Sequence, residues 1–543
     1  MKTSTLAACL ALSLLAPNWP VMADDEKPTA ETAGEAKKGD EGKPDDKKPA
    51  EKAKEEKPVE TYSSVTVGGK VIRYVAKTGM MPILKDDGTP RANVFYVYYA
   101  AMDASGKLAN AEGANRPITF CFNGGPGASA VWLHLGGLGP RRVNLSPEGL
   151  SPATVESTVE NPNTILDATD LVFVDPVGTG LSRASKGEKP DQFFGAEEDI
   201  QAAGEFVRLF TTRENRWSSP KYLCGESYGV TRVSGLAEYL QTKHGFYPEG
   251  LMLISGLINF GTLSNDAGND LPNILYLPSF TAAAFYHHKL APELQKDQDE
   301  SIAAARAFAQ GDYALALLKG SSLLPAERRQ IAEKVAYFTG LTPELVENNN
   351  LRVDPSVFRK ELLLKEGKVL GRYDGRVTGE EADRSEPWPD YDPSYTQIAG
   401  GFASAVNAYI RGTLRYESDT PYHILTSLPW KYSSFEGRYV STEDKLAKAI
   451  KTNARLRILV LTGRRDLAVP EDSMRYSLGH LNLSPGAQTR IAFERFESGH
   501  MMYLFHQDSE KLRSDLVKFI QPPLVLPPNR TPDKLSPTEP SPR

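Results

Sequence analysis

The chain has 543 residues, of which 40% are hydrophobic and 24% are charged, and its formal net charge is −6 at pH 7. This composition is ordinary for a soluble globular protein, and the length allows several domains or one large domain with an insertion. The slightly acidic balance gives no reason to expect a nucleic acid or an anionic membrane as a partner.

The N-terminus has the pattern of a secretory signal peptide over residues 1–23. Met1-Lys2 precedes the apolar run LAACLALSLLA, and small residues follow as far as Ala23. The apolar run is too short for a helix that crosses a membrane, so no membrane span is predicted. The stretch Leu6–Cys9 imitates a lipoprotein processing site, but it comes too early to leave a full apolar region before it. We therefore expect an exported protein, periplasmic or secreted.

Two segments lack the apolar residues that a folded core needs. Residues 24–60 mix Lys, Glu, Asp, Pro and Ala almost without large apolar side chains, and residues 522–543 are rich in proline. Such segments cannot bury enough surface to offset the entropy that ordering costs. We predict a disordered charged spacer and a loose tail, with the folded protein between them.

Eight apolar, β-branched runs predict the strands of one sheet. They are residues 70–76, 93–100, 117–122, 170–175, 221–225, 251–255, 456–461 and 491–496. No helix separates the first two runs, which suggests an antiparallel start. Helix-like stretches separate later runs, which favours a mostly parallel sheet covered on both faces. Residues 259–455 hold helical patterns without a strong strand run, so we predict an α/β core, 61–258 and 456–521, interrupted by a mainly helical insertion.

One pentapeptide has the form of a nucleophile elbow. Gly225-Glu226-Ser227-Tyr228-Gly229 ends a predicted strand and precedes a helical pattern. Glycines on both sides allow the sharp turn that lifts the Ser227 hydroxyl above the sheet. The bare pentapeptide is common by chance, and its place between a strand and a helix is what favours a catalytic serine.

A catalytic serine needs an imidazole base and a carboxylate that orients the base. Downstream, Asp466 and His500 each follow a predicted strand, at the sheet edge where such a site lies, in the order Ser, Asp, His. Asp466 could instead form an Asx turn. His480 and His506 compete as the base, but they lie in or after helical patterns. We predict Ser227, Asp466 and His500 as a catalytic triad.

The glycine-rich stretch FCFNGGPGASA, residues 120–130, allows two interpretations. It fits the G-x-G-x-x-G/A pattern of a dinucleotide site, or a loop whose backbone N–H groups hold an oxyanion. A dinucleotide site requires an acidic residue at the end of the next strand, but a proline-broken loop follows here. The later elbow favours the oxyanion hole, with Gly125 and Tyr228 donating backbone N–H groups.

The other histidines and the cysteines indicate no cofactor. His134 and the pair His287-His288 lack the spacing with Cys or carboxylates that a metal site shows, so neither a metal nor a cofactor is predicted. Beyond the signal peptide only Cys121 and Cys224 remain. Both lie in apolar strand-like runs, where free buried thiols are the commoner case, although an exported protein permits a disulfide.

Five motifs occur in order along the chain: NGGPGAS, DPVGTGLS, GESYG, TGRRD and SGHM. Together they closely resemble the serine carboxypeptidase family of α/β-hydrolases, in its bacterial secreted form, over about Tyr62 to Gln521. The resemblance implies an α/β-hydrolase fold with a mostly parallel, eight-stranded central sheet and a helical cap insertion. It implies peptide substrates and the triad named above, and it implies that residues 175–182 support the site from beside the elbow.

The resemblance also assigns residues to the substrate. It implies that Asn123 and Glu226 help to hold the C-terminal carboxylate of a peptide. Gly124 and Met501, which belong to the same motifs, are assigned to substrate binding with them.

Two departures from the family pattern bear on function. Ala128 stands where the family usually has Cys, so the family's disulfide is absent there. Gly137 stands where the family has a second Glu beside the one before the serine. Without that carboxyl, like-charge coupling does not raise the pKa of Glu226, which we expect to ionise at lower pH than a paired Glu. Arg141 or Arg142 could supply a cationic site for a substrate carboxylate instead.

The sequence thus predicts an exported serine peptidase that acts from the C-terminal end of peptides. The same triad serves esterases and acyltransferases, which remain an alternative, and a non-catalytic binding protein on a hydrolase scaffold is a third. Side-chain preference and oligomeric state are open at this stage.

Overall fold

The computed structural model describes residues 56–110, 115–149, 158–381 and 385–521. The predicted signal peptide, most of the predicted spacer and the predicted tail lie outside these residues, so those predictions remain untested.

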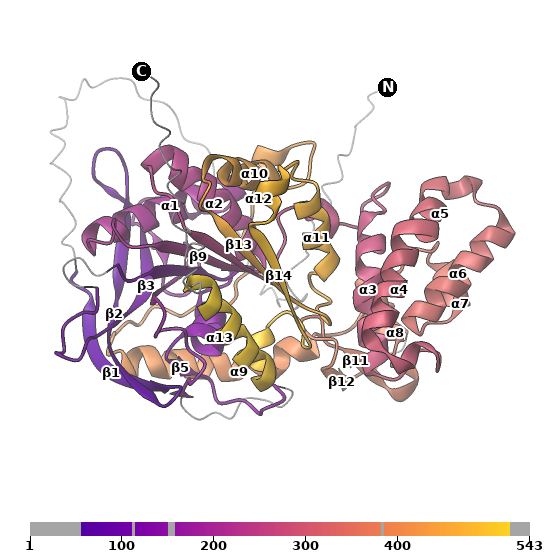
Figure 1. The fold of residues 1–543 in the computed structure, drawn as a ribbon, viewed down its shortest axis with the longest axis horizontal. Coiled ribbons are helices and arrows are strands. Elements are labelled where there is room, and N and C mark those ends of the chain that lie inside the picture. The colour runs from indigo at the N-terminus through magenta and orange to yellow at the C-terminus, as the bar shows by residue number, and fades with distance from the viewer. Residues whose placement is uncertain (1–55, 111–114, 150–157, 382–384, 522–543) are drawn as a thin grey trace, which may run out of the picture.

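A large twisted sheet forms the centre of the described chain (Figure 1). Its strand order is β1-β2-β3-β7-β4-β9-β10-β13-β14, and β8 pairs with β3 at the side. The strands are β1 (Val59–Val67), β2 (Lys70–Leu84), β3 (Pro90–Ala101), β4 (Ile118–Phe122), β7 (Asp170–Val174), β8 (Arg183–Ala184), β9 (Lys221–Glu226), β10 (Gly250–Ile254), β13 (Arg457–Gly463) and β14 (Ile491–Phe496).

The prediction of eight strands is too low, because the sheet has ten strands among the described residues. All eight predicted runs are strands of this sheet. The additions are β8, which has two residues, and β1, which begins at Val59 inside the segment expected to be spacer. β1 is mostly polar, buries only Val65 and Val67, and pairs antiparallel with β2 along its whole length. Such an edge strand carries no apolar run that a sequence pattern could detect.

The pairing agrees with the predicted mostly parallel sheet. β1, β2 and β3 are antiparallel, and β7, β4, β9, β10, β13 and β14 follow in parallel. The carboxyl ends of parallel strands therefore meet at one edge of the sheet. This topology, with crossover helices on both faces, is the α/β-hydrolase fold that the resemblance implied.

Helices cover both faces of the sheet, and the sheet separates the apolar core into two clusters. One face packs against the short π-helical segment η1 (Trp132–Leu138), α9 and α13, and the other against α1, α2, α10 and α11. The helices of these layers are α1 (Ala196–Arg213), α2 (Tyr228–His244), α9 (Pro393–Ala408), α10 (Glu443–Thr452), α11 (Glu471–Gly479), α12 (Pro485–Gln488) and α13 (His506–Ile520).

The insertion, residues 259–455, divides into a separate helical unit and two helices that return to the sheet. The helical unit has its own apolar core and stands beside the β13–β14 end of the sheet (Figure 1). It contains α3 (Leu271–Tyr286), α4 (Gln298–Phe308), α5 (Ala314–Lys319), α6 (Pro325–Thr339), α7 (Pro343–Asn348) and α8 (Pro355–Glu361). A short hairpin, β11 (Lys368–Leu370) and β12 (Thr378–Glu380), follows, and α9 and α10 then pack on opposite faces of the sheet.

The two cysteines of the described residues are free and buried. Cys121 of β4 and Cys224 of β9 are direct neighbours across the parallel pair. Burial raises the pKa of the Cys121 thiol well above its usual range. Among the described residues, none of the helices combines the length and the apolar character needed to cross a bilayer.

Candidate active site

Ser227 stands alone between the end of β9 and the start of α2. Its backbone has φ 59° and ψ −128°, a conformation that non-glycine residues adopt only where the surroundings enforce it. The neighbouring turn is too tight for side chains, because a Cβ atom on Gly225 would lie 2.3 Å from the backbone oxygen of Gly229. The Ser227 N–H donates to the Ile254 carbonyl at 3.0 Å. The elbow thus presents the hydroxyl at the carboxyl edge of the sheet.

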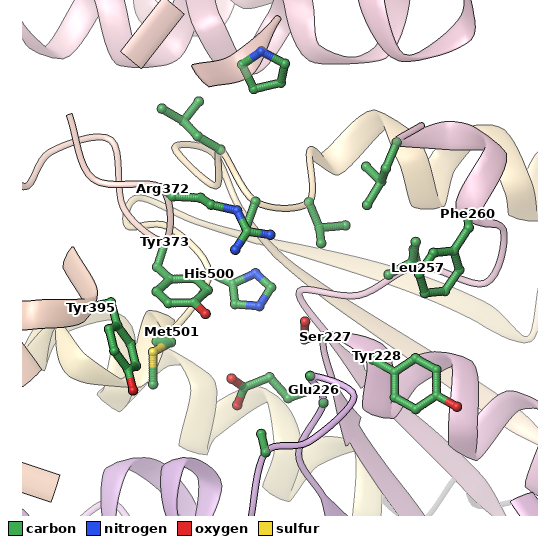
Figure 2. Close-up of a pocket in the computed structure, with 18 of the residues that line it drawn as sticks. Glu226, Ser227, Tyr228, Leu257, Phe260, Arg372, Tyr373, Tyr395, His500 and Met501 are labelled. Carbon is green, nitrogen blue, oxygen red and sulfur yellow. The ribbon is translucent and has the colours of Figure 1, made fainter. Parts of the chain in front are cut away.

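Asp466 and His500 meet at the same edge, in the turns after β13 and β14. His500 Nδ1 lies 2.7 Å from Asp466 Oδ2, and both side chains are buried. The other oxygen of Asp466 accepts from the backbone N–H groups of Ala468 and Val469 at 2.8 Å each. With Nδ1 donating to the carboxylate, Nε2 is left to accept a proton. Figure 2 shows the His500 ring beside Ser227.

The electrostatics of His500 suit a base that becomes charged during reaction. Burial opposes the imidazolium, but the Asp466 carboxylate and, more weakly, Glu226 outweigh that cost, so the pKa of His500 lies above its usual range. The Tyr373 ring stacks on the imidazole with centroids 5.3 Å apart, and the Tyr373 carbonyl accepts from the His500 N–H at 2.6 Å. The base is therefore fixed by a carboxylate on one side and by the insertion on the other.

The competing histidines lie elsewhere. His480 caps the end of α11, exposed, with Nδ1 2.7 Å from the Tyr476 carbonyl, and His506 begins α13. His134 is buried against Phe173, and burial lowers its pKa to about 3. Of the histidines in the described chain, His500 is the one that lines the pocket around Ser227.

The glycine loop after β4 packs directly onto the elbow. A Cβ atom on Gly124 would lie 2.6 Å from the Tyr228 nitrogen and 2.7 Å from Ser227 Cβ, so only glycine allows this approach. Gly125 has φ 101° and lines the pocket together with Tyr228. In the described chain neither backbone N–H of Gly125 or Tyr228 donates to a protein acceptor. Both remain able to donate to an anion above Ser227.

A buried ion pair beneath the elbow holds this loop and Tyr228. Arg232 of α2 pairs with Asp199 of α1 at 2.8 Å and donates to the Asn123 carbonyl at 2.5 Å. The Tyr228 hydroxyl donates to the same Asp199 at 3.1 Å. Nothing in the motifs pointed to Asp199 or Arg232, since each is one charged residue in a helical pattern and the two meet only through the packing of α1 on α2.

The segment after β7 supports the glycine loop, as the resemblance implied. Asp175 Oδ1 accepts from the Ala130 N–H at 2.8 Å and from the Tyr422 hydroxyl at 3.2 Å. Burial raises the pKa of Asp175 to about 7. Tyr422 belongs to the insertion, so this carboxyl joins two distant segments behind the site.

Glu226 lies on the floor of the pocket next to Ser227. The Tyr503 hydroxyl donates to Glu226 Oε2 at 2.8 Å, and the Asn123 side chain donates to the same carboxyl. The Asn123 amide oxygen accepts from the Leu133 N–H at 3.0 Å, which fixes the orientation of that amide. Burial raises the pKa of Glu226 to about 7, although His500, Tyr503 and Asn123 stabilise its ionised form. The sequence-based expectation that Glu226 has a low pKa is wrong. It took account of like-charge coupling only, whereas burial of the carboxyl raises the pKa.

The space beside Gly137 is filled by Tyr503. A Cβ atom on Gly137 would lie 3.0 Å from Cγ and 3.1 Å from Cβ of Tyr503, so a longer side chain there would displace the ring. The phenol that occupies this space is the group that donates to Glu226. The neutral Tyr503 phenol thus occupies the space where the family resemblance implies a second carboxyl group.

The hypothesis that Arg141 or Arg142 binds a substrate carboxylate is wrong. Both form β5 (Arg141–Arg142), which pairs with β6 (Val159–Glu160), and neither lines the pocket. The Arg141 guanidinium donates to the Thr158 carbonyl. Arg372, from the insertion, lines the pocket instead.

The pocket around Ser227 has a volume of about 220 Å³. Figure 2 shows it divided by Ser227 and His500 into two sides: Tyr228, Leu257 and Phe260 on one, Glu226, Tyr373, Tyr395 and Met501 on the other. The assigned residues Asn123, Gly124, Glu226 and Met501 all line it. The insertion contributes further lining residues that carried no recognisable motif, among them Asp354, Arg359, Arg372, Tyr373 and Tyr395.

Fold and site together define an α/β-hydrolase with a serine, a histidine and an aspartate at the carboxyl edge of its sheet. The family model for serine carboxypeptidase matches residues 77–514. This match spans most of the chain, and the protein therefore belongs to the serine carboxypeptidase family and is a serine hydrolase.

Solved structures that resemble the chain share little of its sequence. A proline iminopeptidase from Mycobacterium smegmatis is 13% identical, with 82% of this chain and 97% of that chain covered and a TM-score of 0.35. A thermostable carboxyl esterase from Bacillus coagulans is 12% identical, with the same coverage and a TM-score of 0.35. VinJ is 15% identical, with 82% and 97% covered and a TM-score of 0.36.

Proposed function

We propose that the protein is a serine-type carboxypeptidase that releases C-terminal residues of peptides through an acyl-enzyme on Ser227. The observation that carries the proposal is that Ser227 and His500 line one pocket, with Asp466 bonded to His500 behind it and Glu226 and Asn123 on its floor. The family match supports the same reaction class.

The reaction follows from these positions. The Ser227 oxygen attacks the carbonyl carbon of the last peptide bond while His500 Nε2 takes the hydroxyl proton. The N–H groups of Gly125 and Tyr228 stabilise the oxyanion. The C–N bond then breaks, and His500 returns the proton to the leaving amine. Water, activated by the same imidazole, hydrolyses the ester and restores Ser227.

Recognition of the free C-terminus is assigned to the floor of the pocket. Glu226 in its neutral form can donate to a substrate carboxylate, and the backbone at Gly124 lies beside it in the pocket lining. Because the pKa of Glu226 is about 7, its neutral form persists to nearly neutral pH. Met501 and Tyr395 provide apolar contact for the leaving residue on the same side.

The test combines covalent labelling with a substrate panel. A fluorophosphonate should label the wild-type protein, and Ser227→Ala should abolish labelling and lower turnover by about 10⁶-fold, while Ser484→Ala, which changes the cap of α12, leaves both intact. Hydrolysis of free-carboxylate peptides in preference to their amides supports the carboxypeptidase. Hydrolysis of simple esters with no activity on peptides would support the esterase or acyltransferase instead, and absence of labelling would point to a binding protein.

A further inference from the structure

Arg372 is a cationic residue in the wall of the pocket, and its backbone is hydrogen-bonded on both sides. Its backbone N–H donates to Asp392 Oδ1 at 2.9 Å, and its carbonyl accepts from the Leu467 N–H at 3.2 Å. The next residue, Tyr373, stacks on the imidazole of His500. Figure 2 shows the Arg372 side chain reaching into the cavity close to His500. The backbone from which the side chain extends is therefore held by the same segment that holds the base.

The guanidinium of Arg372 has no anionic partner within the described chain. It forms no ion pair and no side-chain hydrogen bond there, and its nearest aromatic contact is the Tyr373 ring, 5.6 Å away. The other arginine of the pocket differs, because Arg359 Nε donates to the Leu370 carbonyl at 3.0 Å and Nη2 lies 3.9 Å from Asp392. Five donors of Arg372 are thus available to a ligand.

The carboxyl groups near the pocket are occupied by other partners. Glu226 accepts from Tyr503 and Asn123. Asp354 accepts from the Ser356 N–H at 2.8 Å and from the Asn265 side chain at 2.8 Å. The half-buried guanidinium of Arg372 therefore lacks a carboxylate partner among the described residues of the pocket. A planar carboxylate matches its fork of N–H donors.

We propose that Arg372 binds a carboxylate of the substrate, a specificity contact additional to Glu226. The proposal rests on the proposed function of the same pocket and identifies its substrates as peptides that carry negative charge near the scissile bond. The carboxylate is either the C-terminal one or the side chain of an Asp or Glu residue next to that bond.

The test uses Arg372→Met and Arg372→Lys in the whole protein, with Arg455→Met as a matched control. Arg455 is exposed and pairs with Glu249 away from the pocket. The substrates are N-blocked peptides with a neutral last residue, as the free acid and as the amide, and the same amide with Glu in either residue flanking the scissile bond. A neutral aryl ester reports the intact triad.

Arg372→Met should lower kcat/KM for the substrates that carry the recognised carboxylate by about 10- to 100-fold, as loss of a charged hydrogen bond implies. The uncharged amide and the ester should change far less, because Arg372 acts on them only through its weak lowering of the pKa of His500. Arg372→Lys should retain part of the activity. A loss confined to the free acid identifies the C-terminal carboxylate, and a loss confined to Glu-containing amides identifies an acidic side chain. Equal rates for variant and wild type on every substrate, or an equal loss on all, would overturn the proposal.

Failure of the proposed function is distinguished by a binding measurement. The same peptides, as free acids and amides, can be tested for protection of Ser227 against the fluorophosphonate. If the wild-type protein cleaves none of the peptides but acid forms still protect it better than amides, and Arg372→Met abolishes that difference, the carboxylate site stands without the peptidase. If protection never depends on charge, the site is refuted independently of turnover.

Discussion

The sheet edge and the insertion contribute to the pocket in different ways. The sheet places Ser227, Asp466 and His500 in turns directly after β9, β13 and β14, where backbone hydrogen bonds and close packing fix each position. The insertion adds side chains such as Arg372 and Tyr395 from segments between the helical unit and α10. The reacting groups thus stand at the edge of the sheet, together with Asn123, Glu226 and Met501, and the insertion adds further side chains to the wall around the substrate.

This difference indicates which substitutions should affect the chemical step and which should affect substrate selectivity. A residue at the sheet edge touches the reacting atoms, so its loss raises the barrier for every substrate. A residue of the insertion touches the part of the substrate that varies, so its loss changes the ratio between substrates. Tyr373 is the exception that joins the two regions, since it comes from the insertion and stacks on His500.

The largest loss of activity is expected when the catalytic base, His500, is replaced. His500→Ala should lower kcat by about 10⁶-fold on all substrates, because the serine and its base act as a unit. His480→Ala is the matched control, since His480 is exposed at the end of α11, and it should retain wild-type kinetics. Steady-state kinetics of both variants check this. A large loss in His480→Ala together with a small loss in His500→Ala would show that His500 is not the base.

The next effect is expected at Asp466. Asp466→Asn should lower kcat by roughly 10⁴-fold, because an amide in this position favours the wrong tautomer of His500. It should leave KM for peptides nearly unchanged, which separates it from changes in the insertion. Asp419→Asn, at a fully exposed position, serves as the control. A loss at Asp466 of less than about tenfold would show that another group orients the imidazole.

A smaller and selective effect is expected from the insertion. Tyr395→Ala removes an aromatic wall beside Met501, so it should change the ratio of kcat/KM between peptides with large and small last residues by about 10- to 100-fold. The rate of fluorophosphonate labelling should stay constant, because the triad is untouched. Tyr337→Ala, on α6 of the helical unit and outside this pocket, is the control. A uniform loss on all peptides would place Tyr395 with the catalytic centre instead.

The smallest expected effect concerns the pH dependence of carboxylate recognition. Neutral Glu226 is required to donate to the substrate, so the ratio of kcat/KM for the free acid to that for the amide should fall as pH rises through about 7. The Tyr503 hydrogen bond stabilises ionised Glu226 and lowers its pKa, so Tyr503→Phe should raise that pKa and move the fall to higher pH. Loss of the His500 base at low pH affects both peptides alike, so the ratio chiefly follows Glu226, whose pKa the charge of His500 lowers.

The control for this pH measurement is Tyr62→Phe, an exposed residue of β1 remote from the pocket. It should reproduce the wild-type profile. A shift of the fall to lower pH in Tyr503→Phe would contradict the role of Tyr503 as a donor to Glu226. A ratio that does not change with pH in the wild type would remove Glu226 from carboxylate recognition.

The sequence by itself determined the features that depend on short stretches of chain. Apolar runs marked eight of the ten strands of the sheet, and the glycines around Ser227 marked the elbow, because a tight turn restricts which residues fit. Asp466 and His500 could be found since parallel strands end at a common edge, so that residues just after them are neighbours.

Only the tertiary structure decided the environment of those residues. Arg372 enters the pocket because the segment after β11 crosses the turn that carries His500, a contact between remote parts of the chain. Tyr503 fills the space beside Gly137 and bonds to Glu226, and burial, which no local pattern reports, raises the pKa of that carboxyl to about 7. Such groups are defined by packing in three dimensions, where the cost of burying a charge and the fit of a ring depend on every neighbour.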